Sequence, residues 1–147
     1  MNFMKEALKQ AEIAFEQDEV PVGALVVENG KVIAVAHNQN LSLSDPTAHA
    51  EILALRIACE VKKSSRLDGC DLYVTLEPCA MCAGALILAR VNRLIYGAPD
   101  PKTGACGSMF NIATSKKLNH TIKITKGILS VECGGLLKDF FKKKRKK

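Results

Sequence analysis

The sequence predicts an α/β domain built on a mixed, largely parallel sheet of five strands, with helices on both of its faces. Segments of strand length alternate with segments of helical periodicity, which is typical of parallel strand pairing through crossover helices. An Asn-Gly pair separates the first two strand segments, and this pair favours an antiparallel hairpin. Both of these strands are almost continuously apolar, as expected where a sheet is covered on its two faces.

The first elements follow from this periodicity. Apolar residues at helical spacing predict a helix over residues 3–17, and the Asn29-Gly30 hairpin predicts strands over residues 22–27 and 32–36. Asp45-Pro46 offers an N-cap and a first-turn proline, so a helix is expected from there to about Val61. That helix is apolar almost all round and should be buried.

The rest of the chain continues the alternation. We expect strands over residues 71–76, 92–96 and 121–125, helices over 79–90 and from near Ser130, a loop over 98–107, and a short helix within 109–117.

Size and composition restrict the class of protein. The 147 residues, 48% hydrophobic and 24% charged, suit one soluble domain and exclude a disordered chain, a collagen-like repeat and a coiled coil. No apolar run reaches the length of a membrane-spanning helix, so no membrane association is expected. Lys5, Glu6 and Lys9 interrupt the first ten residues, which excludes a secretory signal and predicts a cytoplasmic protein.

The net charge of +6 comes from the last six residues, 142–147, which are all Lys or Arg. We therefore expect a single domain over residues 1–141 followed by a basic C-terminal tail over 142–147. Such a tail suits an anionic partner, most often nucleic acid, although a solvated end that aids solubility is an equal alternative.

Two short segments have the residue types of a metal site. Cys79 and Cys82 are three apart at a helix start, which puts both thiols on one face, and His49 offers a third ligand. A redox dithiol or a coincidental core pair is the alternative for the two cysteines. Three protein ligands leave a zinc coordination position open for catalysis, and Glu51 is the carboxylate nearby to move protons. H-x-E followed by P-C-x-x-C is the signature of zinc nucleobase deaminases.

The stretches DPTAHAEI (45–52) and TLEPCAMCAGA (75–85) resemble bacterial tRNA-specific adenosine deaminases. EVPVGA (19–24), DPKTGA (100–105) and GILSVEC (127–133) extend the resemblance over nearly the whole chain. It implies the three-layer α/β/α cytidine deaminase-like fold, one Zn²⁺ per subunit and a homodimer. It also implies the conversion of adenosine to inosine at the wobble position of a tRNA anticodon stem-loop.

The resemblance also implies roles for single residues. His49, Cys79 and Cys82 would bind zinc, and Glu51 would be the catalytic proton shuttle. Five further positions match the family and would lie at or near the substrate: Asn38, the loop residues Asp100, Lys102 and Thr103, and His120. Without the resemblance, Asn38 would be assigned to a turn, residues 100–103 to a Pro/Gly loop and His120 to the surface. Pro99 departs from the arginine of some relatives, which puts one phosphate contact in doubt.

Two other functions use the same motifs. A deaminase of a free base, nucleoside or nucleotide of the guanine or cytosine type would share the zinc chemistry, but it would not need the basic C-terminus. A zinc-stabilised RNA-binding scaffold without activity would have no use for Glu51 beside an open coordination position.

Overall fold

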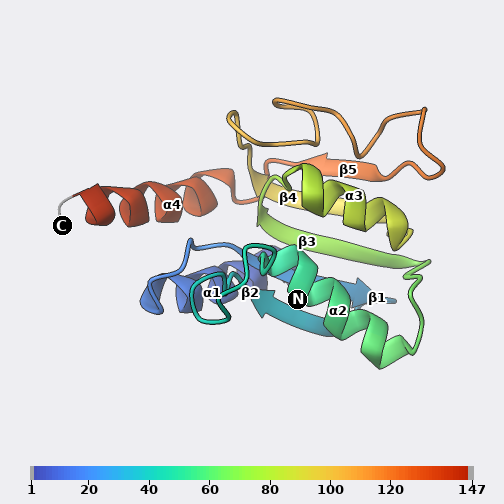
Figure 1. Ribbon diagram of the computed structural model, residues 1–147, viewed down its shortest axis with the longest axis horizontal. Helices are drawn as coiled ribbons and strands as arrows, with labels where there is room; N and C mark the ends of the chain where they lie inside the picture. The colour runs from blue at the N-terminus through green and yellow to red at the C-terminus, as the bar shows by residue number, and fades with distance from the viewer. Residues whose placement is uncertain (1, 146–147) are drawn as a thin grey trace.

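The computed structural model describes residues 2–145 as a five-stranded mixed sheet between two layers of helices (Figure 1). The strand order is β2-β1-β3-β4-β5; β1 is antiparallel to β2 and β3, whereas β3, β4 and β5 are parallel. The mixed sheet and its antiparallel hairpin are confirmed, but the second antiparallel pairing of β1 makes the sheet less parallel than predicted. The strands are β1 (Gly23–Glu28), β2 (Lys31–His37), β3 (Cys70–Leu76), β4 (Arg93–Ala98) and β5 (Lys123–Lys126).

Two helices cover each face of the sheet. α1 (Phe3–Glu16) and α4 (Ser130–Arg145) pack on one face, and α2 (Ala50–Lys62) and α3 (Ala80–Leu88) pack on the other. Successive residues of β1 alternate between the two cores: Ala24 and Val26 join the α2–α3 cluster, and Leu25 joins the α1–α4 cluster. Burial on both faces explains why this strand is continuously apolar.

The β1–β2 hairpin turns at Asn29 and Gly30, whose φ angles are +50° and +74°. A type I′ turn needs positive φ at both central residues, and Asn-Gly adopts it at the lowest steric cost. This turn fixes where β2 runs, and therefore where the chain reaches His37 and the residues that follow it.

Three local predictions are wrong. α2 begins at Ala50 with His49 as its N-cap, because Asp45 instead accepts hydrogen bonds from the backbone and hydroxyl of Thr47 (2.8 and 2.7 Å) and closes a turn. α2 is not buried all round, since Val61 is 58% exposed. Residues 109–117 form turns rather than a helix. Among residues 2–145, no helix has the length and apolar character to cross a membrane.

Candidate metal and catalytic site

The candidate site lies at the end of the sheet where β2, β3 and β4 end and α2 and α3 begin, near the centre of Figure 1. His49 is the N-cap of α2 and Cys79 is the N-cap of α3. The carboxyl ends of strands are where α/β sheets place their sites, because the following helices start there with free N–H groups. Both helix N-termini therefore face one point.

The structure brings His49, Cys79 and Cys82 together at this point. Nδ1 of His49 lies 3.4 Å from Sγ of Cys82 and 3.7 Å from Sγ of Cys79. All three donor atoms lie within 4.8 Å of one another, so the group could hold a metal ion. Cys106 is not part of it; its thiol lies 3.9 Å from the carbonyl oxygen of Pro78.

The electrostatics of the two thiols differ. Hydrogen bonds from the thiol of Cys82 and from His49, stronger here than burial, lower the pKa of Cys79 to about 4. The same contact with Cys79, together with burial, raises the pKa of Cys82. One thiolate therefore forms readily between them, and a bound cation would favour the second.

Glu51 shares the cavity with this group although it is two residues from His49. Glu51 is 4% exposed, and it lines a cavity of about 240 Å³ together with His49 and Cys79. A side chain in the first turn of a helix can reach a point beyond the helix end, which is why the opposite positions on a helical wheel do not separate the two. Burial raises the pKa of the Glu51 carboxyl, so this group is prepared to hold a proton.

Asn38 follows β2 and is buried against the start of α2. Its side-chain Oδ1 accepts a hydrogen bond from the backbone N–H of Ala50 (2.7 Å), and its backbone N–H donates to the carbonyl of Val22 (3.1 Å). Asn38 also lines the 240 Å³ cavity. With one amide oxygen lone pair used by the helix, the side chain has its NH₂ donors left for a ligand.

The loop after β4 forms another wall. Asp100 and Thr103 line the cavity, whereas Lys102 lines an adjoining groove of about 700 Å³. The groove and the cavity share Val20 and Leu76 besides Asp100 and Thr103, so they adjoin each other. The remaining groove residues come from the same loop and from α4: Pro99, Pro101, Leu137, Phe141, Lys144 and Arg145.

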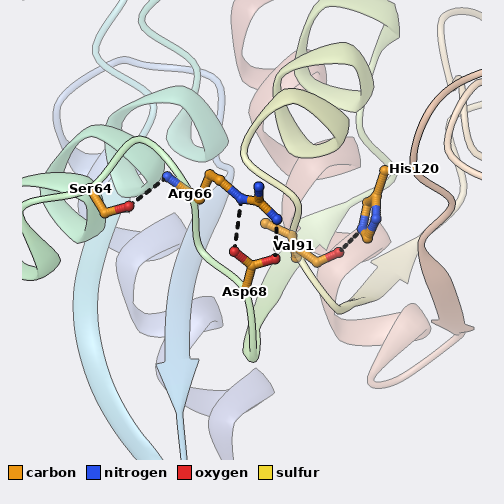
Figure 2. A network of polar contacts seen from close by, with 5 residues as sticks. All are labelled: Ser64, Arg66, Asp68, Val91 and His120. Atoms are coloured by element: carbon orange, nitrogen blue, oxygen red, sulfur yellow. Dashed lines mark hydrogen bonds and ion pairs between the residues drawn. The ribbon is translucent and has the colours of Figure 1, made fainter.

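His120 is not brought to this site. Its Nε2 donates a hydrogen bond to the carbonyl of Val91 (2.8 Å), ahead of β4 (Figure 2). Figure 2 also draws the ion pair of Arg66 with Asp68, which precedes β3. These residues precede parallel strands, so they lie at the opposite edge of the sheet from the cavity. The expected contact of His120 with substrate has no support in this geometry.

Sequence reasoning missed two buried carboxylates, Glu19 and Glu77, each 2% exposed. Glu19 accepts from the backbone N–H groups of Leu41 and Ser42 (3.0 and 2.8 Å). Glu77 lines the cavity and accepts hydrogen bonds from the loop after β4. One signal was available: Glu77 is followed directly by Pro78 and Glu19 lies two residues before Pro21, and both stand next to apolar segments, where a charged residue is unusual.

Comparisons with known proteins agree with this geometry. A family model described as MafB19-like deaminase matches residues 1–145. The tRNA-specific adenosine deaminase of Bacillus subtilis (strain 168) is 48% identical over 145 residues, which is 99% of this chain and 90% of that protein. The protein of the same name from Aquifex aeolicus (strain VF5) is 50% identical over 143 residues, 97% of this chain and 94% of its own.

Solved structures share the fold. One, from a study of A-to-I editing by tRNA:A34 deaminases, matches with a TM-score of 0.89 at 47% identity, covering 92% of this chain and 98% of that one. A guanine deaminase from Nitrosomonas europaea matches with a TM-score of 0.82 at 28% identity, covering 93% and 81%. The five-stranded mixed sheet with two helical layers is the cytidine deaminase-like fold that the resemblance implied. The chain belongs to the family of tRNA-specific adenosine deaminases.

Proposed function

We propose that this protein hydrolyses the adenosine at the wobble position (34) of a tRNA anticodon to inosine. The observation that supports this most is the juxtaposition of a three-donor metal group with the buried Glu51 in one small cavity. The names of relatives at about half identity over nearly the full chain supply the substrate.

We propose Zn²⁺, one ion per subunit, as the metal. The donor set of two sulfurs and one imidazole nitrogen fits zinc, because thiolates and imidazole are its preferred ligands. Three ligands leave a fourth position free, as in catalytic zinc sites. When bound by His49, Cys79 and Cys82, the ion supplies Lewis-acid activation of a water molecule near neutral pH.

Glu51 moves the protons of the reaction. Water adds across the N1–C6 bond of the base, so one of its protons goes to N1. The C6–N bond then breaks and the amino group leaves as ammonia with the second proton of the water. The raised pKa of buried Glu51 suits both the acceptance and the return of these protons. The NH₂ group of Asn38 orients the base by donating to a ring nitrogen.

The two adjoining hollows suit a flipped-out nucleotide. The 240 Å³ cavity has room for one base, and the groove of about 700 Å³ has room for the adjoining ribose and phosphates. Lys102, Lys144 and Arg145 give the groove positive charge, and Phe141 gives it an aromatic face for stacking. Pro99 stands there without the charge that an arginine would bring.

We further propose a cytoplasmic homodimer. The apolar residues of α3 are of two kinds: Leu86 is fully buried, whereas Leu88 is 82% exposed. Exposed Ile57 and Val61 on α2 lie on the same side of the sheet. Such a patch is expected where a second subunit packs.

A substrate panel tests the proposal. The zinc-loaded protein is incubated in parallel with anticodon stem-loops and with free adenosine, cytidine and guanine, and the products are scored as inosine, uridine and xanthine. We expect inosine in a stem-loop with adenosine at the wobble position, and little product from the free compounds. Xanthine or uridine from free compounds, with unreacted stem-loops, would establish the small-molecule alternative instead.

A further inference from the structure

Glu77 stands between the end of β3 and the metal-group residue Cys79, and its buried carboxylate accepts four hydrogen bonds from one loop. Oε1 accepts from the backbone N–H of Asp100 (3.0 Å) and from the hydroxyl of Ser108. Oε2 accepts from the backbone N–H groups of Cys106 and Ser108 (3.0 and 3.1 Å). A single side chain therefore fixes both ends of the loop over residues 100–108.

The loop is folded closely around this carboxylate. A Cβ atom at Gly104 would lie 2.4 Å from the Glu77 carboxylate and 2.5 Å from the carbonyl of Asp100, so only glycine fits there. The N–H of Gly104 donates to Asp100, and the N–H of Ala105 donates to the carbonyl of Pro78 (2.9 and 2.8 Å). The loop is thus held by Glu77, by its own backbone hydrogen bond and by the carbonyl of Pro78.

The part of the loop that faces the cavity is ordered through Asp100. Its Oδ1 accepts from the backbone N–H groups of Lys102 and Thr103 (both 3.1 Å), and its Oδ2 accepts from the Thr103 hydroxyl (2.7 Å). Asp100 and Thr103 line the cavity. The position of this wall therefore depends on the bond between Glu77 and the backbone of Asp100.

A carboxylate is the group that this arrangement needs. Four donors point at its two oxygens: the Ser108 hydroxyl and the backbone N–H groups of Asp100, Cys106 and Ser108. A carboxylate only accepts hydrogen bonds, whereas the amide of Gln would direct its NH₂ at groups that are themselves donors. Hence Gln, although nearly isosteric, cannot keep all four bonds.

We infer that Glu77 is a positioning residue that fixes the Asp100–Thr103 wall of the substrate cavity before substrate binds. It does not touch the reacting atoms; it acts by holding the loop in one conformation, which removes the ordering cost from binding. The inference rests on the proposed function only in assigning the cavity to the substrate.

The test is Glu77→Gln in the zinc-loaded full chain, read first by amide hydrogen exchange. We expect exchange of the Asp100, Cys106 and Ser108 amides to become about tenfold faster, the effect of losing roughly one charge-assisted hydrogen bond. The Leu41 and Ser42 amides, held by Glu19 in the same manner, are the internal control and should keep their protection.

Kinetics and metal content give the second readout. The Glu77→Gln protein should keep one zinc per chain and show a KM for the stem-loop raised about tenfold, with kcat changed little, because the wall acts in binding. A fall in kcat at unchanged KM would overturn the inference, because it would indicate that Glu77 acts on Cys79 and the metal rather than on substrate binding. Unchanged exchange at Asp100, Cys106 and Ser108 would also overturn it.

Two further variants keep the test decisive if Glu77→Gln does not fold. Gly104→Ala leaves Glu77 in place but pushes its carboxylate away, and should reproduce the rise in KM. Ser108→Ala removes only the hydroxyl bond and should have a smaller effect of the same kind. Wild-type KM values in both would contradict the inference. Hydrogen exchange needs no substrate, so an unreactive stem-loop would refute the proposed function and leave this result standing.

Discussion

At the scale of single residues, His49 and Glu51 face one cavity because the helix that bears them starts at its rim. His49 precedes the helix and presents its ring nitrogen to the two thiols, while Glu51 reaches the same space from the first turn without joining the metal group. The different roles of the metal ligand and the proton carrier follow from their positions, His49 before the helix and Glu51 in its first turn. It leads to opposite expectations for substitutions at the two kinds of residue.

Glu51→Gln should keep the zinc and the fold but lose at least about a hundredfold in turnover, because the amide cannot transfer the proton. Cys82→Ala is the matched control and should lose zinc and thermal stability together, since two ligands bind the ion weakly. Metal analysis and inosine formation distinguish them. Wild-type turnover in the Glu51→Gln protein would refute the proton-shuttle role.

Asn38 combines a structural and a binding role, and two substitutions separate them. Asn38→Asp keeps the oxygen that caps Ala50, so it should unfold at a higher temperature than Asn38→Ala, which loses a cap worth about 1 kcal/mol. Both variants lose the NH₂ donors and should show a KM raised about tenfold. Equal KM values for wild type and Asn38→Asp would restrict Asn38 to the capping role.

At the scale of elements, α4 extends past the sheet (Figure 1), and four of its residues line the groove: Leu137, Phe141, Lys144 and Arg145. Its end is fixed on α1: Phe140 packs edge-on against Phe15, and Lys144 pairs with Asp18 at 2.5 Å. The basic residues predicted as a tail thus begin as the last turn of a helix, through Arg145; residues 146–147 lie outside the described part of the chain.

Truncation after Phe141 tests whether these charges bind RNA. It removes six cations and takes the net charge from +6 to zero. Binding of the stem-loop should weaken, and the fall of log K with log salt should become shallower by about 0.7 to 0.9 for each lost phosphate contact. Neutralising Lys116 and Lys117, which are exposed and outside the groove, should leave the slope unchanged. An unchanged slope after truncation would show that the cations at the end of α4 do not contact the RNA.

Local signals in the sequence predicted most of these elements. The features that they did not predict depend on contacts between residues far apart in the chain. The hairpin at Asn29-Gly30 and the closeness of Cys79 to Cys82 depend on neighbours in the chain, so spacing was sufficient. The start of α2 depends on Asn38, twelve positions earlier, whose side chain accepts from the N–H of Ala50, while Asp45 closes its own turn with Thr47. Glu77 accepts a hydrogen bond from Ser108, 31 positions later in the chain, and sequence periodicity cannot predict such a contact.

At the scale of the whole molecule, the exposed apolar residues of α2 and α3 lie on the side of the sheet opposite to α1 and α4. Leu88→Glu should convert the proposed dimer into a monomer, because burial of a carboxylate in an apolar interface is unfavourable. Val131→Glu is the control: Val131 on α4 is equally exposed (83%) but lies outside the patch, so the dimer should persist. A monomeric wild-type protein in sedimentation equilibrium would refute the dimer.

The account as a whole depends on one chemical claim, that a zinc ion at His49, Cys79 and Cys82 and the carboxylate of Glu51 deaminate adenosine in RNA. The direct measurement is a zinc titration of the metal-free protein, following inosine in a stem-loop whose loop holds adenosine at the wobble position and elsewhere. We expect inosine at the wobble position alone, with a rate that rises in proportion to zinc and levels off at one ion per chain. An undiminished rate without metal, or no inosine at full zinc loading, would contradict the claim.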